Sequence, residues 1–359
     1  MTRQAELRQF RDLNVALIGY GYAGKTLHAP LINSVPNLNL VAVCTSHPEK
    51  VLADYPSVKV HRSLDEVLSQ SQIDAVVIAT PNHTHFDLAK QSLLAGKHVV
   101  VDKPFTVNAA QARELKALAE EKGLVLSVFH NRRWDADFLT LRSVIASGKL
   151  VELMSFESRF DRFRPEVRAR WREQAGEGSG LWYDLGPHLL DQALQLFGCP
   201  IAIQADFAMQ RKNAQAVDYF HVLLRYERLR VILHASMLVA EETPRFVVRG
   251  VAGSYTKFGL DTQEESLKRG ELPNAEHYGH DPRDGVLQLQ TAAGNITTST
   301  VPNLRGEYRQ LYAEFHDAVL LNATNPVSLA DAVLTMELIE LACESAALGC
   351  ERIVSLKVN

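Results

Sequence analysis

The chain has 359 residues, of which 46% are hydrophobic and 22% charged, and this composition excludes a disordered chain, a collagen-like fibre and a disulfide miniprotein. Its 38 basic and 42 acidic residues give a net charge of -4, which argues against nucleic acid as a partner because polyanion-binding proteins carry a basic surface. At this length two domains are expected.

The N-terminal segment 1–14 is polar and charged, and no run in the chain approaches the roughly 18 apolar residues of a membrane helix. The four cysteines form no CxxC pair, so neither a zinc site nor a disulfide framework is expected. We therefore expect a cytoplasmic protein with no metal and no membrane partner.

From Asn14 onward, short apolar runs alternate with helical patterns, as in a parallel sheet covered on both faces. The runs predict strands at 15–19, 40–44, 73–80, 97–102 and 124–129. Helix ends are also visible: Ser63 with Glu66 forms a capping box, Thr84 and Asn108 are candidate N-caps, and Gly123 is a stop signal. The prediction is a doubly wound Rossmann domain over residues 1–127.

A glycine-rich loop follows the first predicted strand and opens a helix: Gly19, Gly21 and Gly24 form GxGxxG, with Tyr22 and Ala23 between the last two. The first glycine permits a tight turn, the second lets the backbone approach a pyrophosphate, and the third lets helix and strand pack closely. The strand before and the helix after favour a dinucleotide site over a glycine-rich turn that binds nothing.

The end of the second predicted strand indicates which dinucleotide is bound. An NAD site usually has an acid there, but the sequence reads Thr45, Ser46 and His47, with Lys50 close behind. Hydroxyls and a lysine suit a 2′-phosphate, so NADP is favoured over NAD. The alternative is that the strand end is misplaced by a residue or two and that these side chains only cap the next helix.

A lysine follows the fourth of these strands in the triplet Asp102-Lys103-Pro104. Ligands bind at the carboxyl edge of open α/β sheets, where Lys103 can hydrogen-bond a substrate oxygen and stabilise developing alkoxide charge. Pro104 fixes a turn that can accommodate a cis peptide bond. The alternative is a solvated lysine at a strand end.

After about Gly148 the pattern changes to alternating segments at 151–160, 216–226, 229–238 and 244–250. They predict an α+β domain over 128–359 with a large open, mainly antiparallel sheet, followed by helices at 308–321 and 330–348 and a short final strand. An open sheet with an apolar face suggests self-association, so a homodimer or homotetramer is expected.

Asp184 and His188 are four residues apart within the segment 178–191. On a helix they would share a face, and a histidine beside a carboxylate is a positioned proton shuttle. Two alternatives remain: Asp184 caps a helix while His188 packs in the core, or both bind a metal. The metal is the weaker one, because no further His or Cys has matching spacing nearby.

Three segments together resemble the glucose-fructose oxidoreductase and inositol dehydrogenase (Gfo/Idh/MocA) family: the GxGxxG loop, AGKHVVVDKP at 95–104 and GSGLWYDLGPH at 178–188. The resemblance covers nearly the whole chain. Within the family, the segments at 17–32, 127–135 and 157–165 are most similar to bacterial NADP-dependent scyllo-inositol dehydrogenases.

The resemblance implies an oxidoreductase that transfers a hydride between NADP and a secondary alcohol of a polyol or sugar, with scyllo-inositol as the first candidate. Lys103 matches the catalytic lysine, preceded by Asp102 instead of the usual glutamate. Asp184 matches an acid that binds the substrate or orients the histidine, and His188 matches the proton acceptor. Cofactor contacts are implied at Thr80, Pro81, Asn82, His85, Asp102 and Lys103.

A polyol needs many directional hydrogen bonds, and the substrate contacts expected are Asn131, Arg132, Arg159, Asp161 and Tyr183, with Arg162, Arg164 and Trp171 as further candidates. A solvated face or a subunit contact is the alternative for the arginines. Two other functional classes stay open: a regulator that binds nicotinamide and sugar without turnover, and a metal-assisted lyase or hydrolase.

Overall fold

The computed structural model describes residues 11–355, so most of the polar N-terminal segment lies outside the described residues. The chain divides into two compact units that each draw on three segments. Unit 1 comprises 1–134, 263–278 and 307–334, and unit 2 comprises 135–262, 279–306 and 335–359. The predicted division into an N-terminal domain of residues 1–127 and a C-terminal domain of residues 128–359 stays a prediction.

Unit 1 contains a parallel six-stranded sheet in the order β3-β2-β1-β4-β5-β6, which confirms the doubly wound prediction. Its strands are β1 (Leu13–Ile18), β2 (Leu38–Cys44), β3 (Lys59–His61), β4 (Ala75–Ile78), β5 (His98–Val101) and β6 (Leu126–Val128). Strand β3 forms no apolar run that would predict it, because at the sheet edge Lys59 is exposed and Val60 and His61 are only partly buried.

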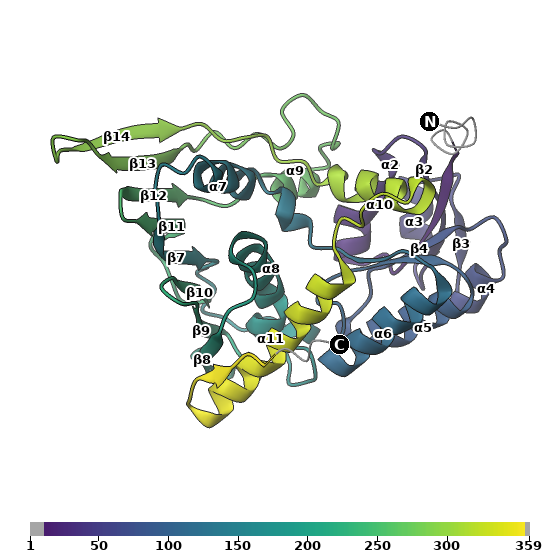
Figure 1. Cartoon of the computed structure of the whole chain (residues 1–359). Coiled ribbons are helices and arrows are strands. Elements are labelled where there is room, and N and C mark those ends of the chain that lie inside the picture. Colours follow the sequence, from purple (N-terminus) through teal and green to yellow (C-terminus); the bar gives the residue numbers. More distant parts are fainter. Residues whose placement is uncertain (1–10, 356–359) are drawn as a thin grey trace. The chain divides into compact units, whose positions relative to one another are not determined.

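Helices cover both faces of this sheet (Figure 1). On one side lie α5 (His85–Leu94) and α6 (Ala109–Lys122), and on the other η1 (Gly24–His28), α2 (Ala29–Asn33) and α10 (Arg309–Leu321). The shorter helices are α3 (Pro48–Asp54), α4 (Leu64–Leu68) and α9 (Gln263–Lys268), and 3-10 turns lie at η2 (Asn82–Thr84) and η3 (Asn131–Trp134).

The predicted helix ends of unit 1 are confirmed in position. Ser63 Oγ accepts from the amide of Glu66, Asn108 Oδ1 accepts from that of Gln111, and Gly123 ends α6 with a φ of 64°. The capping box is only half formed, because the Glu66 carboxylate accepts from the amide of Arg62 and not from that of Ser63. Thr84 is the N-cap residue of α5, but its side chain makes no capping hydrogen bond. Its hydroxyl instead donates back to the carbonyl of Pro81 at 2.7 Å, so it is engaged inside the preceding turn.

Unit 2 contains a nine-stranded sheet in the order β14-β13-β12-β11-β7-β10-β9-β8-β15. Only β7 (Leu153–Arg159) and β10 (Arg230–Ser236) pair in parallel, so the sheet is mainly antiparallel, as predicted. The remaining strands are β8 (Ala202–Ala208), β9 (Tyr219–Arg225), β11 (Pro244–Gly250), β12 (Gly253–Phe258), β13 (Gly285–Gln290), β14 (Ile296–Val301) and β15 (Arg352–Ile353).

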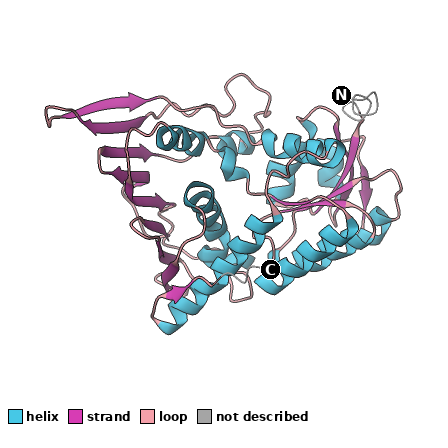
Figure 2. Cartoon of the chain, in the orientation of Figure 1, coloured by secondary structure: helices cyan, strands magenta, loops and turns pink. Residues whose placement is uncertain are grey.

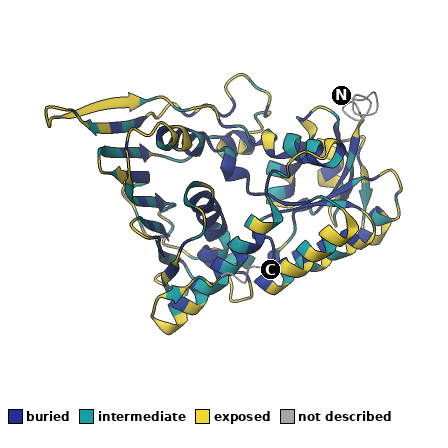
Figure 3. Cartoon of the chain, viewed as in Figure 1, coloured by how far each residue is buried: buried dark blue, intermediate teal, exposed yellow. Residues whose placement is uncertain are grey.

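The helices of unit 2 gather on one face of its sheet (Figure 2). They are α7 (Ala136–Ala146), α8 (Gly180–Phe197) and the later part of α11 (Leu329–Leu348), with a 3-10 turn at η4 (Trp171–Glu173). Strand β9 shows the consequence: Phe220, Val222 and Leu224 are buried, and the residues between them are half-exposed. The edge strand β14 is exposed along most of its length (Figure 3).

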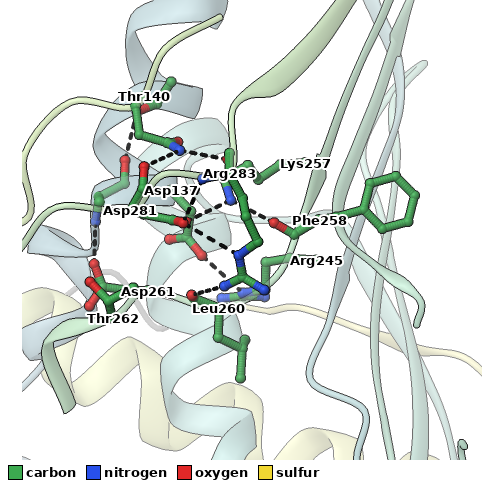
Figure 4. A network of polar contacts seen from close by, with 12 residues as sticks. Asp137, Thr140, Arg245, Lys257, Phe258, Leu260, Asp261, Thr262, Asp281 and Arg283 are labelled. Atoms are coloured by element: carbon green, nitrogen blue, oxygen red, sulfur yellow. Dashed lines mark hydrogen bonds and ion pairs between the residues drawn. The ribbon is translucent and has the colours of Figure 1, made fainter. Parts of the chain in front are cut away.

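A buried polar network ties β12 to the chain that enters β13 (Figure 4). Lys257 Nζ lies 2.8 Å from Asp281 Oδ2, and neither side chain reaches solvent. Asp281 also accepts from the amide of Arg283, whose guanidinium donates to the carbonyl of Leu260. Because a buried charge is tolerated only when it is paired, this pair fastens the segment before β13 to strand β12.

Candidate functional site

The glycine loop has the shape that a dinucleotide requires. Gly19 has a φ of 95°, and a Cβ there would lie 2.5 Å from the carbonyl oxygen of Ala79. A Cβ on Gly24 would overlap the carbonyl oxygen of Gly19, whereas one on Gly21 would have no neighbour within 4 Å. The outer glycines are therefore required by the fold, and the middle glycine leaves open space at its backbone, where a pyrophosphate could approach.

Tyr22, in the same loop, is linked to Arg132 through Glu264 on α9. Glu264 accepts from the Tyr22 hydroxyl at 2.7 Å and from the Arg132 guanidinium at 2.8 Å. Burial and the charge of Glu264 raise the pKa of the Tyr22 hydroxyl, so it stays protonated and donates. Arg132 is 7% exposed, and part of its donor capacity is used within unit 1. Glu264 was not among the predicted site residues, because it lies 242 residues from Tyr22 in the sequence.

Strand β2 ends at Cys44, so Thr45 and Ser46 directly follow the strand end, as the prediction of NADP assumed. Thr45 Oγ1 accepts from the amide of His47, which begins α3 as its N-cap, while Ser46 and Lys50 are exposed. A further cation lies at the same edge: Arg62 follows the last residue of β3, and its guanidinium has no ion-pair partner among the described residues. Arg62 was not among the predicted cofactor residues, because β3 was not among the predicted strands.

At the carboxyl end of β5, Asp102 holds the backbone of the turn that carries Lys103. Its Oδ1 accepts from the Lys103 amide at 2.8 Å, and the Lys103–Pro104 peptide bond is cis. Burial alone would raise the pKa of Asp102, but His28, Lys103 and His85 lower it to about 2. An ionised carboxylate therefore lies beside Lys103 throughout the neutral range. His28 was not among the predicted site residues.

The segment after β4 lies at the same sheet edge. Pro81 is exposed, Asn82 is buried, and Thr80 Oγ1 lies 2.7 Å from the hydroxyl of Thr84. The ring of His85 is fully buried between two carbonyl oxygens, those of Pro104 at 2.8 Å and Thr80 at 2.9 Å. Its ring thus connects the loop after β4 to the turn after β5.

In unit 2, Asp184 and His188 both lie on α8, where the four-residue spacing gives them one face. His188 is 5% exposed. The Asp184 carboxylate lies 3.6 Å from the Nε of Arg172, whose guanidinium stacks over the ring of Trp171. Neither Asp184 nor His188 occupies the N-cap of α8, which is Ser179, so the capping alternative for Asp184 is wrong.

Each of the predicted substrate residues of unit 2 has partners within that unit, and Arg159 and Asp161 both lie beside His234. Tyr183 contacts Cys343 on α11, and burial together with that thiol raises the pKa of Tyr183. Arg159 pairs with Glu157 at 2.9 Å. Asp161 has a side chain only 4% exposed, and its oxygens accept from the amide of Ser236 and the hydroxyl of Thr243.

Of the predicted residues, unit 1 thus holds the glycine loop, Thr45, Ser46, Lys50, the segment 80–85, Asp102, Lys103, Asn131 and Arg132, whereas unit 2 holds Arg159, Asp161, Tyr183, Asp184 and His188. Within the described part of the chain, no cluster of three or more His, Cys, Asp or Glu side chains could hold a metal ion. No helix among residues 11–355 has both the length and the apolar character of a membrane span.

Two family models match the chain in succession. Residues 13–130 match the NAD-binding Rossmann fold of an oxidoreductase family, and residues 142–352 match the C-terminal alpha/beta domain of the same family. The chain belongs to the Gfo/Idh/MocA oxidoreductase family.

Relatives of the whole length support this membership. The chain is 55% identical over 337 residues to the uncharacterized oxidoreductase YdgJ of Escherichia coli, covering 93% of this chain and 96% of YdgJ. It is 37% identical over 340 residues to scyllo-inositol 2-dehydrogenase (NADP(+)) IolW of Bacillus subtilis, covering 94% and 95%. The solved structure of YPO2259 from Yersinia pestis superposes with a TM-score of 0.93 at 49% identity, covering 97% and 98%.

Proposed function

We propose that this Gfo/Idh/MocA oxidoreductase uses NADP and acts on a secondary alcohol, or the corresponding ketone, of a cyclitol or sugar. The observation that carries the proposal is the pairing, within unit 1, of an open glycine loop with Lys103 at the carboxyl edge of the same sheet. Scyllo-inositol is the first substrate to test, because IolW carries that activity in its name.

The cofactor assignment is supported by charge at the end of β2. Bound NADP would accept or supply the hydride at its nicotinamide ring. Lys50 and Arg62 would neutralise the 2′-phosphate and Thr45 and Ser46 would hydrogen-bond it, while no acid directly follows β2 to bind the ribose of NAD. The glycine loop with Tyr22 and Ala23 would hold the pyrophosphate, and Thr80, Pro81, Asn82, Asp102 and Lys103 would border the nicotinamide, with His85 shaping their loop.

For the alcohol substrate we assign three residues. In oxidation His188 takes the hydroxyl proton, Asp184 orients the imidazole, and Lys103 stabilises the negative charge that develops on the oxygen. In reduction His188 returns the proton. Asn131, Arg132, Arg159, Asp161 and Tyr183 remain proposed as substrate contacts, although the internal hydrogen bonds of Asp161 favour a supporting role for it.

The test is a titration of the purified protein with NADP and with NAD, followed by a panel of inositols and aldoses at saturating cofactor. We expect absorbance of reduced nicotinamide to appear with NADP and scyllo-inositol. Folded protein that binds NADP but turns over no alcohol in the panel would contradict the substrate class, and a preference for NAD would contradict the cofactor assignment.

We also propose that the chain forms a homodimer or homotetramer, because one face of the unit 2 sheet carries half-exposed residues that none of the helices described for that unit covers. Light scattering tests this directly. A particle with the mass of a single chain would contradict it.

A further inference from the structure

A row of buried polar side chains in unit 1 leads to the turn that carries Lys103. Tyr312 on α10 and His28 at the end of η1 are both 0% exposed, and Asp102 is 5% exposed. The Tyr312 hydroxyl lies 2.6 Å from His28 Nδ1, and His28 Nε2 lies 3.9 Å from Asp102 Oδ1. These residues come from three elements, and no role proposed above uses Tyr312 or His28.

One end of the row is a protonated tyrosine. Burial, with the nearby charge of Asp102, raises the pKa of Tyr312 well above its usual value, so its hydroxyl keeps the proton. This hydroxyl and His28 Nδ1 form the 2.6 Å hydrogen bond, and the other ring nitrogen, Nε2, lies on the side of the Asp102 carboxylate.

The row ends on the backbone of the proposed catalytic lysine. The Asp102 oxygen that faces His28 is the same Oδ1 that accepts from the Lys103 amide at 2.8 Å. The charged and titratable groups around this carboxylate are His28, Lys103, His85 and Tyr312. The ring of Phe129, 4.2 Å from that of His28 between centroids, packs against the imidazole and restricts its rotation.

We propose that Tyr312 and His28 are positioning residues, which fix the Asp102 carboxylate and through it the backbone of Lys103. The inference rests on the proposed function, since it takes Lys103 as the residue that acts on the substrate oxygen. It explains how a short aspartate supports the lysine. The carboxylate accepts a hydrogen bond from the amide of its own neighbour, and on its other side His28 Nε2, which has no hydrogen-bond partner, lies within ion-pair distance of it.

Two variants of His28 test its contact with Tyr312 and its contact with Asp102 separately. Asparagine places its amide near the position of Nδ1 and keeps the contact with Tyr312, whereas glutamine places an amide donor near the position of Nε2 and keeps the contact with Asp102. We expect His28→Asn to lower kcat at least about tenfold and His28→Gln to stay within about threefold of the wild type, with the KM for NADP nearly unchanged in both.

A matched control and a second measurement exclude a loss of folding. His98→Asn replaces a half-buried histidine at the opposite end of β5, where Nδ1 accepts from the Val125 amide, and its kcat should stay within about twofold of wild type. In the cofactor-free protein, the ¹³Cγ resonance of Asp102 reports the carboxylate directly. Its titration midpoint should rise by about one pH unit or more in His28→Asn and stay low in His28→Gln.

The outcomes distinguish the inference from the function on which it rests. An Asp102 midpoint that moves while kcat is unchanged overturns the inference and leaves the oxidoreductase proposal intact. An equal loss of kcat in the Asn and Gln variants also overturns it, because the role would then be general packing. A wild-type chain that folds but shows no turnover with NADP or NAD overturns both.

Discussion

The main-chain amide of Thr45 donates a hydrogen bond to the carbonyl of His61, with 3.0 Å between nitrogen and oxygen. This contact extends the parallel pairing of β2 and β3 past Cys44 and places the turn after β2 next to the residue that follows β3. Lys50 and Arg62 thereby lie near the edge at which an NADP-binding sheet receives the 2′-phosphate.

Removal of either cation should therefore weaken the binding of NADP but not that of NAD. We expect Lys50→Ala and Arg62→Ala each to raise the KM for NADP about tenfold, the loss of one charge-assisted contact, and to leave the KM for NAD nearly unchanged. Lys59→Ala, which removes an exposed lysine from the other end of β3, is the control. A parallel rise for both cofactors would show that these residues do not recognise the 2′-phosphate.

The glycine loop gives a prediction that separates folding from binding. Gly21→Ala meets no neighbour within 4 Å, so the melting temperature should stay within a few degrees of wild type, while NADP binding weakens at least about tenfold because the new methyl fills the space for the pyrophosphate. Gly24→Ala should lower the melting temperature, because its Cβ overlaps the Gly19 carbonyl. Calorimetry of binding and of unfolding measures both effects, and a Gly21→Ala variant with unchanged affinity would contradict the site.

Lys103→Ala and His188→Ala should each lower kcat by roughly 10²- to 10⁴-fold, the range for lost proton transfer or charge stabilisation. Lys97 is a useful contrast, because its ammonium donates to the carbonyls of Gln70 and Ile73 at the amino end of the same strand. Lys97→Ala should cost about 1–3 kcal/mol of unfolding free energy and leave kcat per folded molecule unchanged. Comparable kcat values in all three variants would remove Lys103 and His188 from the mechanism.

The depressed pKa of Asp102 makes stability depend on pH in a definite window. The folded-state pKa is lowered from 3.8 to about 2, so the carboxylate contributes stability above about pH 4 that is lost as the pH falls toward 2. The contribution is on the order of 2 kcal/mol. Denaturant unfolding between pH 2 and pH 7 should show this loss in the wild type and a flatter profile in Asp102→Asn; identical profiles would refute it.

Breaking the ion pair of Lys257 and Asp281 should lower the free energy of unfolding strongly and leave catalysis unchanged. Lys257→Ala leaves a fully buried carboxylate with fewer partners and should cost about 3–5 kcal/mol, measured by denaturant unfolding. The double variant Lys257→Met with Asp281→Asn should cost clearly less, because neither charge is then left buried alone. A double variant as unstable as the single one would mean that packing, and not charge, dominates at this position.

The sequence predicted the elements whose burial is continuous or strictly alternating. Strands β1, β4 and β5 are apolar because they are covered on both faces, and β9 alternates because one face is covered. Strand β8 and strands β12 to β14 were not predicted, because polar or exposed residues interrupt both patterns there.

For the site, the local motifs were visible in the sequence and their long-range partners were not. His28 meets Tyr312 across 284 residues and Tyr22 meets Glu264 across 242, and no periodicity records such pairs. The sequence contains one indication of the role of His28. It is a polar residue close to Leu31 and Ile32, in a helical segment whose other buried residues are not polar. A lone histidine there requires a polar partner inside the core.

The exposed edge strand β14 bears on how the protein behaves at high concentration. An unpaired edge invites another strand to add to it, and apolar side chains along the edge would strengthen that addition. Residues Thr297 to Thr300 are instead hydroxyl-bearing and exposed, so strand addition there gains backbone hydrogen bonds and little apolar burial. Valine at Thr298 and Thr300 would make this edge a site of aggregation.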